Sequence, residues 1–125
     1  IGRGSGCIAI SIAKHTDSTV TAIDISSKAI DIAKVNAKLN SVDVNFIVDD
    51  IFNFCYEKKY DLIVSNPPYV LNSEKKYMHK NVIDYEPHSA LFVDDNDPLI
   101  FYKKIAEIAI NKLNKNGYLF FEINW

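Results

Sequence analysis

Short β-branched segments alternate with amphipathic segments along this chain, and this alternation constrains the fold most strongly. The interval 19–25 is rich in Thr, Val and Ile, which is typical of a buried strand. The next interval carries Ile30, Ala33 and Ala37 at helical spacing. Ser26 precedes it and is a suitable helix N-cap. The pattern predicts an α/β fold with a mostly parallel, doubly wound sheet and helices on both faces.

Two further helices are expected from the same pattern. The first covers the apolar interval 7–15. The second begins at Asp97-Pro98, where Asp97 would cap the helix and Pro98 would occupy its first position. Gly117 is expected to end this helix. Its buried face is predicted to consist of Phe101, Ile105 and Ile108.

Three further strands are expected at the intervals 44–48, 60–65 and 118–123. The interval 67–95 is rich in Asn, Tyr, Lys and Pro, and we expect it to be irregular. A loop of this length in a compact domain is usually functional. Within and just after it, Asp94, Asp95 and Asp97 are most simply a solvated turn and the helix cap.

Length and composition count against several classes of protein. A chain of 125 residues fits one domain, so residues 1–125 are treated as a single domain. The formal net charge of −2 offers no basic surplus for tight binding to nucleic acid. No run of about 18 apolar residues exists, so no membrane partner is expected. The expected protein is a cytoplasmic monomer.

The cysteines and histidines do not indicate a metal site. Cys7 and Cys55 are too far apart for a zinc pattern, and we expect reduced, packed thiols. His15, His79 and His88 are scattered without ligand spacing and are expected on the surface or in loops. No metal is therefore expected.

A glycine-rich turn opens the chain. Gly2, Gly4 and Gly6 can adopt backbone angles closed to other residues and let a ligand approach the main chain. The helix that follows would direct free N–H groups at such a ligand. The spacing differs from the Gly-x-Gly-x-x-Gly of a dinucleotide fingerprint. Taken alone, the turn is a weak signal, and a purely structural glycine turn is the alternative.

Acidic residues follow two of the predicted strands. Asp24 ends the strand after the glycine turn, where an acid in a Rossmann-like domain accepts hydrogen bonds from ribose hydroxyls. It could instead cap the next helix. Asp49-Asp50 follows the strand expected at 44–48. One carboxylate could accept the adenine amino group and Phe52 could cover the ring, or the pair is a solvated loop end. The glycine turn and Asp24 together favour an adenosine-type ligand. They do not distinguish NAD from S-adenosylmethionine.

The most specific motif is Asn66-Pro67-Pro68-Tyr69, directly after an apolar strand. Two successive prolines fix the backbone and supply no N–H donors. Their carbonyls and the Asn carbonyl are acceptors, and the Tyr ring is a flat wall. Such a pocket suits a planar –NH₂ group whose nitrogen is aimed at an electrophile. The alternative is a polyproline turn that ends a strand.

Four segments carry a resemblance to a known family. The Asn-Pro-Pro-Tyr motif resembles the signature of methyltransferases that act on amide or exocyclic amino nitrogen. The interval 2–10 is similar to the cofactor loop of their glutamine branch, and 63–70 to its catalytic strand. The interval 84–92, with Tyr-Glu-Pro followed by Ala-Leu-Phe, resembles the glutamine N5-methyltransferases of peptide chain release factors. The resemblance covers nearly all 125 residues.

The resemblance implies a Rossmann-like class I methyltransferase fold, here cut at both ends and without the family's N-terminal helical substrate domain. It implies S-adenosylmethionine as cofactor and a release factor as protein substrate. It also implies that Asn66 and Pro67 hold the substrate amide, with Pro68 and Tyr69 beside it. The cofactor site would comprise Asn66 and the following residues: Gly2, Gly4, Gly6, Asp24, Ile25, Asp50, Ile51 and Phe52.

Two departures from the family pattern weaken parts of this match. Arg3 stands where the family usually has Thr, and it could crowd the methionine end of the cofactor or turn outward. The interval 93–97 replaces a Gly-rich segment found in many members.

Several alternatives stay open at this point. A glutamine methyltransferase acting on a ribosomal protein has almost the same motifs, and an N6-adenine methyltransferase of DNA or RNA shares the Asn-Pro-Pro-Tyr pocket. A catalytically incompetent fragment is a third possibility, and a nicotinamide dehydrogenase is disfavoured by the glycine spacing.

Overall fold

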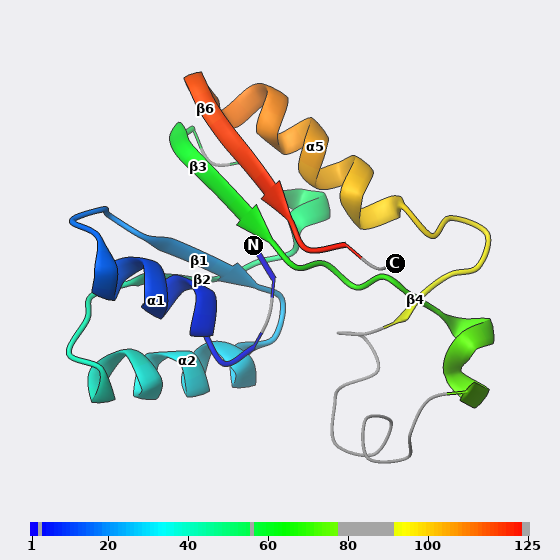
Figure 1. Cartoon of the computed structure of the whole chain (residues 1–125), viewed down its shortest axis with the longest axis horizontal. Coiled ribbons are helices and arrows are strands. Elements are labelled where there is room, and N and C mark those ends of the chain that lie inside the picture. The colour runs from blue at the N-terminus through cyan, green and yellow to red at the C-terminus, as the bar shows by residue number, and fades with distance from the viewer. Residues whose placement is uncertain (3, 56, 78–91, 124–125) are drawn as a thin grey trace. The chain divides into compact units, whose positions relative to one another are not determined.

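A computed structural model describes residues 1–2, 4–55, 57–77 and 92–123. The chain forms two compact units, Ile1–Tyr56 and Glu57–Trp125, and each is described by itself (Figure 1). Every strand of the described residues pairs with one partner in parallel, in three two-stranded sheets. The predicted α/β class and parallel pairing are therefore confirmed, while a single doubly wound sheet stays a prediction.

The first unit packs two helices with one pair of parallel strands. Its elements in chain order are α1 (Cys7–His15), β1 (Thr21–Asp24), α2 (Ser27–Leu39), β2 (Asn45–Val48) and the 3₁₀ turn η1 (Ile51–Asn53). The strands β1 and β2 pair in register over their four residues (Figure 1). Both strands therefore end at the same edge of the pair.

The helix α2 forms as its sequence pattern predicts. Ser26 is its N-cap, and the Ser26 hydroxyl accepts a hydrogen bond from the Ala29 N–H at 3.2 Å. Ile30, Ala33 and Ala37 are buried, with at most 4% of their surface exposed. Two of these three residues are alanine, whose small side chain leaves room for α1 to pack closely.

The second unit is built on the parallel pair β3–β6. Its elements are β3 (Tyr60–Ser65), β4 (Val70–Leu71), the 3₁₀ segment η2 (Asn72–Tyr77), β5 (Phe92–Val93), α5 (Ile100–Lys112) and β6 (Leu113–Phe121). Figure 1 shows α5 lying along β6. The short strands β4 and β5 form a second parallel pair.

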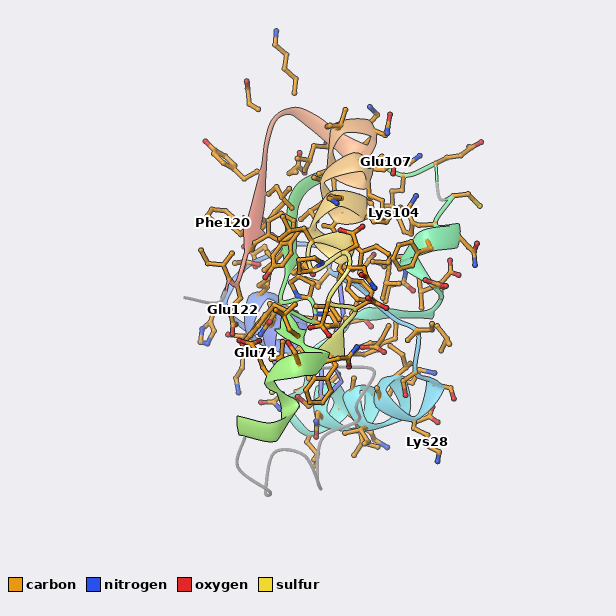
Figure 2. The ribbon with its side chains drawn as sticks, turned by 90° about the vertical axis from the view of Figure 1, so that its right-hand side faces the viewer. Lys28, Glu74, Lys104, Glu107, Phe120 and Glu122 are labelled. Atoms are coloured by element: carbon orange, nitrogen blue, oxygen red, sulfur yellow. The ribbon has the colours of Figure 1, made fainter. Side chains whose placement is uncertain are left out.

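The core of the second unit lies between α5 and one face of the β3–β6 pair. Ile105 and Ile108 of α5 are buried as predicted, together with Ile63 of β3, whereas Phe101 is half-buried. Side chains of the opposite strand face are exposed, including Phe120 at 57% (Figure 2). The strands thus alternate between a covered and an uncovered face.

Both predicted ends of α5 are wrong. The helix begins at Ile100, and its N-cap Leu99 makes no capping hydrogen bond. Asp97 does not cap it, because its carboxylate pairs with the Lys103 ammonium at 2.7 Å. The helix ends at Lys112 and β6 follows at once, so Gly117 lies inside a strand. An added Cβ there would lie 3.1 Å from the Asp61 carbonyl, so close strand approach explains this glycine.

The interval 67–95 is more regular than predicted, since it contains β4, η2 and β5. The Asp95 carboxylate accepts hydrogen bonds from the Ser73 N–H and hydroxyl at 3.2 and 2.8 Å. Asp95 therefore ties a turn to η2 and is more than a solvated residue. The Asp94 carboxylate accepts from the Asn96 N–H at 2.8 Å, as a turn residue does. Residues 78–91, with the Tyr-Glu-Pro segment and two histidines, lie outside the described residues.

The cysteines differ from expectation in one respect. Cys7 and Cys55 are free thiols, but both are exposed rather than packed. His15 is exposed at the end of α1, as predicted. Across the residues described, no three His, Cys, Asp or Glu side chains are arranged to hold a metal ion. The helices of the same residues are too short or too polar to span a bilayer.

Candidate functional site

The polar residues singled out in the sequence lie at the carboxyl ends of parallel strands in both units. Asp24 is the last residue of β1, Asp50 follows β2 closely, and Asn66 follows β3 directly. Ligands of open parallel sheets bind at this edge. Each unit therefore has its own candidate ligand-binding edge, and each edge is described by itself.

The glycine turn lies beside the end of β1 in the first unit. Gly2, Gly4 and Gly6 have φ angles of +73°, +52° and +77°, in the left-handed region that favours glycine. An added Cβ would meet nothing within 4 Å at Gly2 or Gly4, so a ligand has room to approach the main chain there. At Gly6 it would lie 2.9 Å from the Ala33 Cβ. The third glycine therefore serves the packing of α1 on α2.

Asp24 fixes the glycine turn from the end of β1. Its Oδ2 accepts a hydrogen bond from the Gly4 N–H at 3.0 Å, and its Oδ1 accepts from the Ser26 N–H at 2.9 Å. The carboxylate thus joins the turn to the start of α2, although the cap of the helix itself is Ser26. An ionised carboxylate offers about four acceptor positions, so Asp24 retains capacity for further donors.

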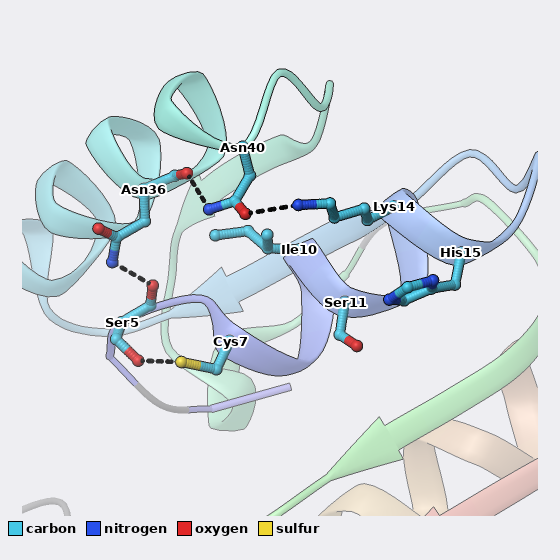
Figure 3. A pocket seen from close by; sticks show the side chains of 8 residues that line it. All are labelled: Ser5, Cys7, Ile10, Ser11, Lys14, His15, Asn36 and Asn40. Carbon is cyan, nitrogen blue, oxygen red and sulfur yellow. Dashed lines mark hydrogen bonds between the residues drawn. The ribbon is translucent and has the colours of Figure 1, made fainter.

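A second brace on the turn comes from α2, as Figure 3 shows. The Asn36 amide donates a hydrogen bond to the Ser5 carbonyl at 2.9 Å. Asn40 donates to the Asn36 carbonyl at 2.9 Å and accepts from the Lys14 ammonium at 3.1 Å. These side chains line a shallow, open pocket of about 300 Å³ between α1 and α2. The network holds the turn from the side of the helices.

The residues after β2 form a polar turn with apolar neighbours. The Asp50 carboxylate accepts from the Phe52 N–H at 3.0 Å and so caps η1. Phe52 is 40% exposed and Ile25, after β1, is 66% exposed, while Ile51 is half-buried. The Asp49 N–H donates to the Asp24 carbonyl at 3.0 Å, which ties the ends of β1 and β2 together. Exposed apolar groups beside fixed carboxylates can bind a flat polar ring.

The candidate site residues of the second unit form the Asn66–Tyr69 segment. Asn66 is 9% exposed, Pro67 is fully buried, and Pro68 and Tyr69 are half-buried. The Asn66 Oδ1 atom is buried and has no hydrogen-bond partner among the described residues. An unpaired buried acceptor of this kind costs about 1–3 kcal/mol, so it is retained only where a role offsets that cost.

A comparison of the sequence with known families decides the classification. Residues 1–90 match the profile of the methyltransferase small domain. The chain belongs to the methyltransferase small domain family. This match includes the glycine turn, both acidic turns and the whole Asn66–Tyr69 segment.

Three bacterial proteins illustrate what this methyltransferase small domain is similar to. The chain is 57% identical over 126 residues to a release factor glutamine methyltransferase of Flavobacterium psychrophilum, covering 99% of this chain and 44% of that protein. It is 50% identical to a release factor glutamine methyltransferase of Bacteroides thetaiotaomicron, covering 99% of this chain and 46% of that protein. A bifunctional methyltransferase of Rickettsia bellii is 44% identical, and the match covers 100% of this chain and 23% of that protein. The chain thus spans less than half the length of these relatives.

Three residues of this methyltransferase small domain escaped the sequence analysis. Asn36 holds the glycine turn, while Tyr102 and Glu122 meet beside the start of the Asn66–Tyr69 segment. Glu122 had a usable signal, because it directly follows an apolar strand and so lies at a ligand-binding edge. Asn36 and Tyr102 are polar residues within amphipathic helices, and nothing local distinguishes them from residues on a solvated face.

Proposed function

We propose that the protein transfers a methyl group from S-adenosylmethionine to the side-chain amide nitrogen of the glutamine in the Gly-Gly-Gln motif of peptide chain release factors. The observation that carries this proposal is the buried, unpaired Oδ1 of Asn66 at the carboxyl end of β3. A primary amide offers two N–H donors, and such an acceptor suits one of them. The names of the two relatives at 57% and 50% identity support the choice of substrate.

The candidate site residues of the first unit suit S-adenosylmethionine. Gly2 and Gly4 leave their backbone open, and Asp24 has free acceptor capacity for ribose hydroxyls. Asp50 and Phe52 suit the adenine group, with Ile25 and Ile51 as apolar neighbours and Gly6 shaping the turn. When bound, the cofactor supplies an activated methyl group on a sulfonium.

In this proposal the Asn66–Tyr69 segment of the second unit activates the amide. An amide nitrogen is a poor nucleophile, because its lone pair is delocalised into the carbonyl. In the proposed mechanism Asn66 Oδ1 accepts one N–H and the Pro67 carbonyl accepts the other, which orients the nitrogen. Pro68 and Tyr69 form the walls of the amide pocket in this mechanism. Such placement lowers a barrier by roughly 7–11 kcal/mol at best. Acceptors fixed in advance also stabilise the positive charge that grows on nitrogen.

The fold proposed for this function is the class I methyltransferase fold, a doubly wound and mostly parallel sheet in one domain over residues 1–125. The parallel pairing within each unit supports it, as does the position of Asp24, Asp50 and Asn66 at carboxyl ends of strands. We propose that this domain acts as a monomer on its protein substrate.

The Asn66→Ala variant tests the proposal. Methyl transfer to a purified release factor is measured together with the Kd for the cofactor by calorimetry. We expect kcat/KM to fall by about 10²–10³-fold, as when a fixed transition-state hydrogen bond is removed, with the cofactor Kd unchanged. Asn72→Ala is the matched control, because Asn72 is exposed and lies six residues further along. It should retain full activity.

Two results would contradict this assignment. A rise in the cofactor Kd of Asn66→Ala large enough to account for the lost activity would limit Asn66 to the cofactor site. Retention of activity would remove its role altogether. Parallel reactions with a ribosomal protein and with adenine-containing DNA separate the rival substrates, since the proposal expects methyl transfer only to the release factor.

A further inference from the structure

The carboxyl end of β6 is tied to α5 by Tyr102. The Tyr102 hydroxyl donates a hydrogen bond to the Glu122 carbonyl at 2.9 Å. Its ring meets the Phe121 ring edge to face, with centroids 5.0 Å apart and planes at 67°. One side chain of the helix therefore holds two successive residues at the point where the strand ends. Figure 2 labels Glu122 there, just beyond Phe120.

The same end of β6 is tied to the start of the Asn66–Tyr69 segment. Phe121 pairs in register with Ser65, and the Glu122 N–H donates to the Ser65 carbonyl at 3.0 Å. Ser65 directly precedes Asn66 and is 1% exposed. The backbone of Glu122 is thus held on both sides, by β3 through its N–H and by α5 through its carbonyl.

The Tyr102 side chain is half-buried. Burial raises the pKa of its hydroxyl, and the charges of Tyr69 and Glu122 raise this pKa further. Through the contacts of Glu122, Tyr102 is linked to Ser65, the residue directly before Asn66.

We propose that Tyr102 is a positioning residue, which fixes the carboxyl end of β6 and thereby the placement of Asn66 for methyl transfer. This inference rests on the proposed function. Tyr102 acts through Glu122 and Phe121 rather than by touching the substrate. A small displacement of a reacting group lowers a rate strongly, because the reacting atoms must lie about 3–3.5 Å apart. The tie therefore acts on kcat more than on cofactor binding.

Tyr102→Phe tests this role, because it removes only the hydroxyl and keeps the ring contact. The matched control is Tyr118→Phe, the same chemical change on an exposed residue of β6. We expect kcat for release factor methylation to fall about 3- to 10-fold in Tyr102→Phe, the factor that the loss of one hydrogen bond gives. The KM for S-adenosylmethionine should stay within about twofold of the wild type. Tyr102→Leu should lower kcat further, since it also loses the ring contact with Phe121.

Amide hydrogen exchange gives a readout that does not depend on activity. In Tyr102→Phe the Glu122 and Asn66 amides should exchange faster than in the wild type, and in Tyr118→Phe they should not. Unchanged kcat and unchanged exchange in Tyr102→Phe would overturn the inference. A lower melting temperature with an unchanged kcat would also overturn it, because that result describes a purely structural tie. A wild-type protein inactive on release factors would count against the proposed function alone, and the exchange rates would still decide the positioning role.

Discussion

Gly6→Ala is the substitution for which the structure predicts the clearest loss of stability. Gly6 precedes α1 with a φ of +77°, which L-residues rarely adopt. An added Cβ would lie 2.9 Å from the Ala33 Cβ and 3.3 Å from the Ile10 Cδ1. Both neighbours are buried and belong to the contact of α1 with α2. The new methyl group therefore meets side chains that have little freedom to move.

The magnitude has two parts. The left-handed conformation costs an L-residue about 1–2 kcal/mol. The overpacked contact adds about 1–3 kcal/mol. Gly4 isolates the first part, because its φ is +52° but an added Cβ would meet nothing within 4 Å. We therefore expect Gly4→Ala to lower the free energy of unfolding by about 1–2 kcal/mol and Gly6→Ala by about 2–5 kcal/mol.

Urea denaturation followed by circular dichroism measures both losses, with the wild type as reference. The reduced chain entropy of alanine in the unfolded state affects both variants alike and cancels in their difference. That difference should be about 1–3 kcal/mol. Equal losses in Gly6→Ala and Gly4→Ala would refute the reasoning, since they would mean that α1 does not pack closely against Ala33.

Two further predictions concern the brace of the glycine turn and the core. Asp24→Asn leaves one of the two backbone N–H groups bound by Asp24 without an acceptor, so the free energy of unfolding should fall by about 1–3 kcal/mol and calorimetry should show weaker cofactor binding. Asp31→Asn, on the exposed face of α2, should change neither quantity. Equal effects of the two substitutions would contradict the role of Asp24 in holding the glycine turn. Ile105→Ala, at a residue 1% exposed, should cost about 2–5 kcal/mol in chemical denaturation. Ile110→Ala, at a residue 83% exposed on the same helix, should cost less than about 0.5 kcal/mol, and a similar loss in both would contradict the assigned core.

The elements that the sequence predicted best depend on local physics. Ser26 caps α2 because a hydroxyl before an amphipathic run satisfies a free N–H group. Ile30, Ala33 and Ala37 are buried because their spacing places them on one helix face. These features need no knowledge of distant residues, so one sequence is enough to predict them.

The features that were mispredicted or missed depend on contacts between distant residues. Asp97 is of a residue type that often caps helices, yet its carboxylate forms an ion pair with Lys103. Gly117 resembles a helix stop, but the approach of β3 accounts for it. The hydrogen bond from Tyr102 to Glu122 requires that β6 run back along α5, which no local sequence pattern specifies. The candidate site was predicted at the level of motifs, and its supporting contacts were not.

Methylation of one glutamine is the central claim, and mass spectrometry of the substrate tests it most directly. The protein is incubated with S-adenosylmethionine and a purified release factor, whose Gly-Gly-Gln peptide is then fragmented. We predict one added methyl group on the side-chain amide of that glutamine, and none on a release factor in which it is replaced by alanine. An unmodified glutamine from a protein that binds the cofactor, or a methyl group on adenine-containing DNA instead, would contradict the claim.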